Sequence, residues 1–551
     1  MGMFKRSLAV VIMSAMLISG VAACGSSAEK ANESTSASSA VASESSAAAA
    51  ESTTAAPDVS EKMEISVALW GIDEALANAE NDQFLKDMYG KLNITLKPRQ
   101  ITWDDYTQKI QIWTASGDMP DIMAIDAIGT TYYRNWVNQG VVKALPDDLS
   151  KYPTLNEYLN KPDIQALKED GKLYTVPRSL YDSLDYCAHD RNVFYRWDLA
   201  QKAGITKEPE TWDEFKAMLK AIVDKDPEGK KISGLTAVNV KQIGGFFWLY
   251  SNPAATSDGS GSDFKWIKKD GKYVPAVLTT ELSLPSLQNI RDMYEQKMID
   301  RDIAQMKGTQ AYDKFVSGAS AAVLEVGYGN VNAQINDRWK KLHPDVPLLD
   351  AVKKADYFPS TDGNKYHATF KTYWSESYFS SKMDDKKMDR IMLLYDYMLK
   401  PETKEFYRYG VKDVDYTKEG DKIVKITSQA DLDKKQPSSA NLQCLVEFDN
   451  AYQYDSNNFT MDPAIVKAAQ DDLKHAKEVT KQPDYEVKLT PVSTPTKDKF
   501  SILDHDFMLK IMAGKEPVEK MWDDVLKEYE AKGLSKMVDE VNGKAKELGL
   551  N

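Results

Sequence analysis

Few residue patterns in this sequence could support catalytic or metal chemistry. The five histidines show no metal-ligand spacing, and neither a His-Glu-x-x-His nor a Gly-x-Ser-x-Gly string occurs. Residues 224–229 begin like a calcium loop, but Leu235 stands where that loop needs an acidic ligand. We therefore predict no catalytic residue, no metal site and no cofactor. A pair of carboxylates suited to glycoside cleavage stays open, because only its separation in space identifies it.

Cys24 is the residue whose neighbours indicate a definite chemistry. Lys5 and Arg6 precede an apolar run over residues 8–18, which is typical of a secretory signal and too short to span a membrane. The small residues 21–23 stand directly before Cys24, and this Val-Ala-Ala-Cys ending resembles the bacterial lipobox. The resemblance implies that residues 1–23 are a signal peptide and that the thiol of Cys24 carries a diacylglycerol.

Residues 24–62 are rich in Ser, Ala, Thr and Glu. Such a composition buries too little apolar surface to offset the entropy of ordering, so we predict a disordered tether. Two or more acyl chains hold a protein firmly at a bilayer. We therefore expect a membrane-anchored protein on the extracellular face of the cell membrane.

The charge balance of the chain is acidic. Removing Lys5 and Arg6 with the signal lowers the formal net charge from −13 to −15. An acidic surface disfavours nucleic acid as a partner. We expect a monomer that meets the membrane only through its lipid.

The periodicity of apolar residues predicts an α/β arrangement in two blocks. The first block has strands near 63–69, 94–96 and 120–126 and helices near 84–89 and 104–115. The second has strands near 193–195, 234–238 and 321–326, with helices over 198–203 and from Thr211. A long helix is expected over 387–409, and residues 462–550 are expected to be mainly helical. Alternating strands and helices indicate a mostly parallel sheet.

Four strings in this order carry a family resemblance. They are residues 115–122 with Gly-Asp-Met-Pro-Asp-Ile, residues 171–177 with Gly-Lys-Leu-Tyr-Thr-Val-Pro, residues 194–215 ending in Thr-Trp-Asp-Glu-Phe, and residues 315–323 with Phe-Val-Ser-Gly. Together with the lipobox they resemble the family 1 extracellular solute-binding proteins, the maltose-binding-protein-like subunits of ABC importers.

The resemblance implies a two-lobed, periplasmic-binding-protein-like fold of type II, with a cleft between the lobes and a helical C-terminal part. Lobe 1 is expected to contain residues 63–183 and 364–425. Lobe 2 is expected to contain residues 184–363 and 426–551. The expected partners are a small-molecule or oligosaccharide ligand and the transmembrane subunits of an ABC permease.

Proteins of this kind bind by closure, which needs complementary contacts but no reaction. Sugars present C–H faces that stack on aromatic rings and hydroxyls that bond to carboxylates, amides and arginine. We therefore predict ligand contacts from aromatic and charged residues at strand ends and crossings. The candidates are Trp70, Asp73, Asp126, Arg178, Trp248, Tyr328, Trp374 and Glu376.

Two alternatives remain open at this stage. The first is a lipid-anchored glycan-active enzyme, which a carboxylate pair across the cleft would favour. The second is a receptor for a peptide, metal or anion on the same fold, which a cluster of cationic or metal-ligating side chains would favour. The fold alone does not choose among these ligands.

Overall fold

The computed structural model describes residues 58–102, 105–128, 130–189, 191–238, 240–255, 264–306, 309–325, 327–368, 371–448, 452–500 and 505–550. The predicted signal peptide, the lipidation residue Cys24 and the tether as far as residue 57 lie outside the described residues. All of the sheets and helices below belong to one compact unit that begins at residue 54.

The first sheet forms where the first predicted block places it. Its strand order is β2-β1-β3-β11-β4. β1 pairs in parallel with β2 and β3, whereas β11 runs antiparallel to both β3 and β4. Sequence analysis predicted β1, β2 and β3 as strands, but neither β4 nor the antiparallel β11 that lies between β3 and β4. The strands are β1 (Met63–Ala68), β2 (Ile94–Pro98), β3 (Ile122–Ile125), β4 (Thr175–Ser179) and β11 (Tyr373–Phe379).

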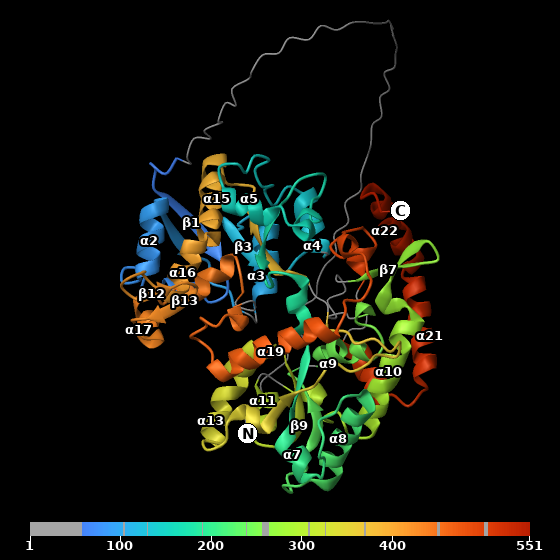
Figure 1. The fold of residues 1–551 in the computed structure, drawn as a ribbon. Coiled ribbons are helices and arrows are strands. Elements are labelled where there is room, and N and C mark those ends of the chain that lie inside the picture. Colours follow the sequence, from blue (N-terminus) through green and yellow to red (C-terminus); the bar gives the residue numbers. More distant parts are fainter. Residues whose placement is uncertain are drawn as a thin grey trace, which may run out of the picture. The chain divides into compact units, whose positions relative to one another are not determined.

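Helices pack on this sheet through their apolar faces. Figure 1 shows α2 and α15 beside β1, and Ile65, Val67, Met88 and Ile391 are fully buried between them. The helices that follow the chain here are α1 (Ile72–Leu76), α2 (Gln83–Leu92), α3 (Tyr106–Ser116), α4 (Thr131–Asn138), α5 (Pro153–Leu159), α6 (Pro162–Gln165), α15 (Asp385–Leu399) and α16 (Pro401–Tyr409).

The long helix expected over 387–409 is two helices. Lys400 is extended, with φ −61° and ψ 137°, between α15 and α16. Pro401 causes the break, because a proline disfavours helical backbone in the residue before it and is well suited to the first position of a helix.

The second sheet has the strand order β10-β5-β9-β6, with β6 parallel to β9 and the other pairs antiparallel. Its strands are β5 (Asn192–Arg196), β6 (Ser233–Thr236), β9 (Ser320–Glu325) and β10 (Val352–Lys354). The helices around it are α7 (Trp197–Lys202), α8 (Trp212–Lys225), α9 (Val240–Phe247), α10 (Thr280–Glu295), α11 (Gln310–Val316), α12 (Gly327–Asn330), α13 (Asp337–Leu342) and α14 (Leu348–Ala351).

The predicted start of α8 is confirmed. The hydroxyl of Thr211 accepts a hydrogen bond of 3.2 Å from the backbone N–H of Glu214, which satisfies a donor that has no partner within the helix. Phe215, Met218 and Leu219 then lie buried on one face of α8.

The C-terminal part is helical, as predicted, and completes the core of the second sheet. Ile511, Trp522 and Val541 are fully buried in the cluster that contains Leu235 of β6. Figure 1 shows α21 running beside α10. The helices are α19 (Pro463–Val479), α20 (His505–Ala513), α21 (Val518–Ala531) and α22 (Leu534–Glu547).

Two hairpins stand outside the sheets, and a later segment packs against the first sheet. The hairpins are β7 (Trp266–Lys269) with β8 (Lys272–Pro275), and β12 (Tyr416–Glu419) with β13 (Lys422–Lys425). Lobe 1 was expected to end at residue 425, but α17 (Gln429–Lys435) and α18 (Ser439–Leu442) are followed by Leu445 and Val446, which are fully buried against the first sheet. The backbone N–H of Ser438 also donates to the carboxylate of Asp82 at 2.7 Å. Residues 438–446 therefore pack against the first sheet.

Candidate functional site

Trp70 follows the buried strand β1 and is half-buried. Its ring centroid lies 6.3 Å from that of Tyr106, in a stacked arrangement, and 6.1 Å from that of Trp374, edge to face. Asp73 is half-buried in the first turn of α1, three residues further along the chain. Trp70 and Trp374, both predicted to contact ligand, therefore lie together although 304 residues separate them in the sequence.

Trp374 stands at an irregularity of β11. The pairing of β11 with β4 shifts register between Tyr373 and Glu376, and Ser375 has a positive φ of 65°. Such a bulge locally changes where side chains point and is common beside functional sites. Here it accompanies a half-buried Trp374 whose ring lies 5.1 Å from the ring of Phe448.

Arg178, on β4, is completely buried beneath these rings. Its guanidinium carbon lies 4.5 Å from the ring centroid of Trp70 and 5.0 Å from that of Phe448. It donates to the carbonyl of Cys444 at 3.2 Å and to the hydroxyl of Ser375. Burial lowers the pKa of Arg178 to about 10, so the side chain keeps its positive charge at neutral pH.

Glu376 lies on β11 and pairs with Ile125, the last residue of β3. Asp126 follows Ile125 in the chain. Its carboxylate accepts hydrogen bonds from the backbone N–H groups of Ala127, at 3.1 Å, and Ile128, at 3.4 Å, and from the hydroxyl of Tyr378 at 3.0 Å. Complete burial, and then the nearby charge of Asp126, raise the pKa of Glu376 to about 7. The structure thus places Asp126 and Glu376 together, with Glu376 engaged by the backbone that follows β3.

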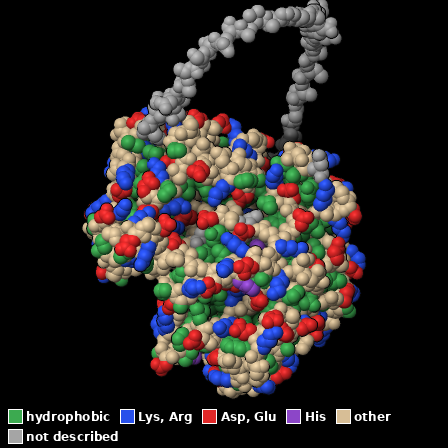
Figure 2. All heavy atoms as spheres, in the orientation of Figure 1, with side chains coloured by type: hydrophobic (Ala, Val, Ile, Leu, Met, Phe, Trp, Pro, Cys, Tyr) green, Lys and Arg blue, Asp and Glu red, His purple; other side chains and the backbone are tan. Residues whose placement is uncertain are grey.

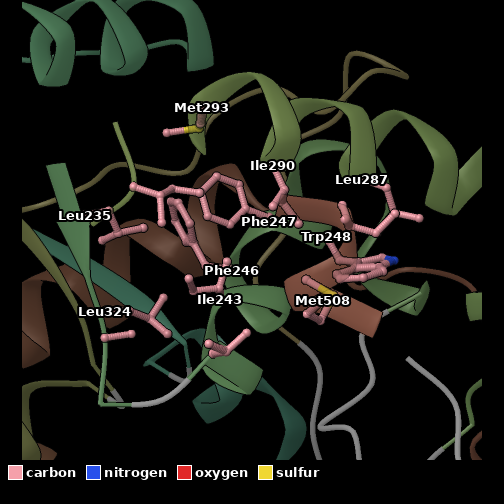
Figure 3. Close-up of a cluster of buried hydrophobic side chains, with 14 of the residues drawn as sticks. Leu235, Ile243, Phe246, Phe247, Trp248, Leu287, Ile290, Met293, Leu324 and Met508 are labelled. Atoms are coloured by element: carbon pink, nitrogen blue, oxygen red, sulfur yellow. The ribbon is translucent and has the colours of Figure 1, made fainter. Parts of the chain in front are cut away.

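Trp248, which was predicted to contact ligand, does not join this group. It is 2% exposed in a 3-10 helix (Trp248–Tyr250) and donates from its indole to the hydroxyl of Ser283 at 3.3 Å. Figure 3 shows its ring beside Leu287 and Met508 within the core of the second sheet. A large apolar ring after a strand is equally suited to packing and to ligand contact, so the sequence pattern alone does not separate the two roles.

Tyr328 lies in α12, after β9, and is 7% exposed. Its ring packs edge to face against Phe194, with 5.3 Å between centroids, in a cluster that includes Val331 and Trp339. Burial raises the pKa of its hydroxyl well above the ordinary value. In the structure Tyr328 belongs to the packing of the second sheet rather than to the aromatic group around Arg178.

Sequence reasoning did not single out Phe448 or Tyr106 as site residues. Tyr106 carried a signal, since it lies on the apolar face of the predicted helix over 104–115. Phe448 carried none. It reaches Arg178 because residues 446–448 pair with Ser179: the N–H of Phe448 donates to the carbonyl of Ser179 at 2.8 Å, and the N–H of Ser179 donates to that of Val446 at 2.8 Å.

A cavity of about 310 Å³ adjoins Phe448. One wall carries Glu447, which accepts from the hydroxyl of Tyr407 at 2.5 Å and from Arg408 at 2.6 Å, and which also pairs with Lys404. Burial would raise the pKa of Glu447, but the two positive charges outweigh burial and hold the pKa below its ordinary value. The cavity is polar and lies where the chain passes between the two sheets.

The carboxylates of Asp226 and Glu228, in the acidic loop after α8, are bonded to neighbouring groups of the chain. Asp226 accepts from the backbone N–H groups of Lys230 at 3.0 Å and Lys231 at 2.9 Å, and Glu228 pairs with the ammonium groups of Lys202 at 2.5 Å and Lys230 at 2.8 Å. Burial opposes ionisation of Glu228, but these two lysines lower its pKa to about 2. Within the described ranges, no group of three or more His, Cys, Asp or Glu side chains could hold a metal ion.

The surface carries both signs of charge. Figure 2 shows Lys and Arg side chains interspersed with Asp and Glu over the visible face, so charge of one sign does not gather there. Among the helices that the structure describes, none has the length and apolar character needed to cross a membrane.

Comparison with known proteins identifies the fold and the family. The family model for bacterial extracellular solute-binding proteins matches residues 73–405. The polygalacturonan/rhamnogalacturonan-binding protein YtcQ of Bacillus subtilis (strain 168) is 23% identical over 461 residues, which cover 82% of this chain and 84% of that protein. Lipoprotein LipO of the same strain is 24% identical over 338 residues, 58% of this chain and 62% of LipO.

Among solved structures, the alginate-binding protein AlgQ2 without calcium ion superimposes with a TM-score of 0.65 at 16% sequence identity. The match covers 88% of this chain and 98% of AlgQ2. The predicted two-lobed fold of type II is thereby confirmed, and it includes the C-terminal helices that the four sequence strings left unassigned.

Proposed function

Because this chain belongs to the bacterial extracellular solute-binding proteins, we propose that it is the substrate-binding subunit of an ABC importer and that it captures an oligosaccharide. The proposed site is the aromatic platform, which we define as Trp70, Tyr106, Trp374 and Phe448. The permease subunits of the importer would take the solute from the bound complex. The family consists of receptors, and no reaction is needed for this role.

The observation that carries the proposal is the half-buried state of all four platform rings, two of which lie against the buried Arg178. Rings in a packed core close over one another, whereas these leave area for a partner. Sugar C–H faces stack on such rings, and the polar groups of Asp73 and Asp126 nearby suit hydroxyls. The Bacillus relative YtcQ is a polygalacturonan/rhamnogalacturonan-binding protein, which supports a carbohydrate ligand here.

A glycan-active enzyme is less well supported by these contacts. Glu376 is completely buried, and one of its oxygens is held by two backbone N–H groups and a tyrosine hydroxyl. A general acid for glycoside cleavage must reach the glycosidic oxygen. The bonds of Glu376 instead fix the backbone at the end of β3, which suits a residue that shapes a binding surface.

We also propose that Cys24 is lipidated after removal of residues 1–23 and that residues 24–62 tether the receptor to the outer face of the membrane. The Val-Ala-Ala-Cys ending of the signal supports this proposal, as does the likeness to lipoprotein LipO. A tether of this kind keeps a monomeric receptor close to its permease at high effective concentration. Metabolic labelling with an alkynyl fatty acid tests it, with Cys24→Ala as the variant that should lose the label.

A thermal-shift screen of residues 58–551 tests the binding function. The panel contains neutral oligosaccharides, uronate oligosaccharides, peptides and small anions. A ligand that binds only the folded state raises the melting temperature, by an amount that grows with its concentration. The proposal predicts a rise with at least one oligosaccharide, and a rise with peptides alone would overturn it.

A further inference from the structure

We propose that Arg178 is a positioning residue that holds the aromatic platform together and joins it to the segments connecting the two lobes, rather than a residue that touches the solute. This inference rests on the proposed function and corrects the prediction of Arg178 as a ligand contact. Three observations carry it: its burial, the origin of its partners and the hydrogen bonds of the residue that follows it.

The side chain of Arg178 is 0% exposed, so no solvent-facing surface of it is open to a solute. Its guanidinium contacts Trp70 and Phe448 and donates to Ser375 and to the carbonyl of Cys444. Each of these hydrogen bonds fixes backbone or side chain next to a platform ring, because Ser375 follows Trp374 and Cys444 lies four residues before Phe448. One buried group thus fixes parts of three segments that are distant in sequence.

Only arginine suits this position. Its guanidinium is planar and can lie against aromatic rings while its N–H groups donate in the plane. A lysine ammonium is a compact charge with no flat surface, so it could keep one or two hydrogen bonds but would lose the contact with two rings. The substitution Arg178→Lys therefore retains the charge and removes the positioning.

Three segments of the chain that run between the two sheets meet at the backbone next to Arg178. They contain residues 179–181, residue 372 and residues 446–448. Ser179 pairs with residues 446–448, and the N–H groups of Leu180 and Tyr181 donate to the carbonyl of Thr372 at 2.8 and 3.0 Å. Phe448 therefore belongs to the platform through its ring and to the connection through its backbone. A solute that rests on the platform would contact Phe448, whose backbone hydrogen bonds hold these connecting segments. Solute binding is thereby coupled to closure of the two lobes.

The test compares Arg178→Lys with Arg196→Lys, a matched control in the second sheet. Arg196 is also buried, at 2% exposed, and its guanidinium carbon lies 4.8 Å from the ring centroid of Trp339. Hydrogen exchange followed by mass spectrometry needs no ligand. We expect Arg178→Lys to speed exchange at least fivefold in peptides covering residues 444–448, and Arg196→Lys to leave those peptides unchanged. Faster exchange confined to β4 itself would overturn the proposal.

Binding provides the second readout, measured by calorimetry with a galacturonate trisaccharide and with maltotriose as probes. For a probe that the unchanged protein binds, Arg178→Lys should raise Kd at least tenfold and Arg196→Lys less than twofold. Equal affinity of the two variants would overturn the positioning role. If the unchanged protein binds neither these probes nor any other oligosaccharide, the proposed function fails, while the exchange experiment still decides whether Arg178 positions Phe448.

Discussion

Two buried arginines of this protein lie against tryptophan, one in each sheet, and their surroundings differ. Arg196 forms two hydrogen bonds to the carboxylate of Asp198, at 2.8 and 2.7 Å, and its tryptophan, Trp339, is 1% exposed. Arg178 bonds to a carbonyl and a hydroxyl, and its ring neighbours Trp70 and Phe448 are half-buried. An arginine packed on a tryptophan therefore belongs to a closed core in the second sheet, whereas the same combination of residue types supports a partly exposed aromatic surface in the first sheet.

An arginine packed on a tryptophan therefore does not by itself identify a ligand-binding site. What distinguishes the first sheet is that its rings keep exposed area and come from the residues after β1, from α3, from β11 and from residue 448, which meet only in the folded chain. A core residue affects stability alone, whereas a platform residue affects binding more than stability. The predictions that follow separate these two effects, beginning with the largest.

Arg196→Met should cost the most stability. It removes the partner of Asp198 and one donor to each of the carbonyls of Phe315 and Val316. The loss of this charged pair and of the other hydrogen bonds of Arg196 should cost about 3 kcal/mol. We expect urea unfolding to show this loss while calorimetry gives an unchanged Kd for the bound oligosaccharide. A large change in Kd would mean that the second-sheet arginine also serves the site.

Trp374→Ala should weaken oligosaccharide binding about 30-fold, or about 2 kcal/mol, because it removes a central aromatic contact. The matched control is Trp113→Ala, since Trp113 is also half-buried. Its ring centroid lies 4.9 Å from the guanidinium carbon of Arg99. Both variants should lose similar stability, but only Trp374→Ala should change Kd. Equal binding by the two variants would remove Trp374 from the site.

Glu376 gives the first sheet a pH dependence. Its folded pKa of about 7 lies above that of an exposed glutamate, so the folded state holds the proton more tightly than the unfolded state does. The stabilisation is complete below about pH 4.5 and is lost as the pH rises through 7. Between pH 5 and 7 the loss should be about 2 kcal/mol, at about 1.4 kcal/mol per pKa unit.

The control for this prediction is Glu376→Gln, which keeps the shape of the side chain and removes its titration. The difference in unfolding free energy between the unchanged protein and the variant should therefore vary with pH as stated, since all other groups are common to both. A difference that is constant from pH 5 to 7 would contradict a raised pKa at Glu376.

The smallest effect is expected at the start of α8. Thr211→Ala removes the hydroxyl that accepts from the N–H of Glu214 and should cost about 1 kcal/mol. Thermal unfolding would detect this loss, and Kd should stay within twofold of the unchanged protein. Thr211 thus provides a second variant in which stability falls without a change in binding.

Much of the fold could be predicted from the sequence because its signals are local. The capping pattern from Thr211 to Glu214 and the alternation of Ile65 and Val67 each decide a local structure. The antiparallel entry of β11 could not be predicted, because it depends on pairing with strands some 200–250 residues away in the chain. The helix break at Pro401 did carry a local signal, which the apolar periodicity around it obscured.

Some residues of the proposed site could be selected from the sequence. Residue type and position after a strand selected Trp70, Trp374, Asp126 and Glu376, which the structure brings together in the first sheet. The same reasoning selected Trp248 and Tyr328, which are buried in the core. Residue type and position after a strand do not show whether an aromatic side chain is buried in the core or partly exposed. Phe448 was missed since only the pairing of residues 446–448 with Ser179 brings it to Arg178.

A crystal structure of residues 58–551 with a bound oligosaccharide would locate the binding site. We expect a sugar ring in contact with Trp374 or Trp70, with Arg178 remaining beneath the platform and out of reach of the sugar. A sugar bound away from all four platform rings would contradict the proposed site. A sugar hydroxyl or carboxylate bonded to the guanidinium of Arg178 would contradict its role as a positioning residue.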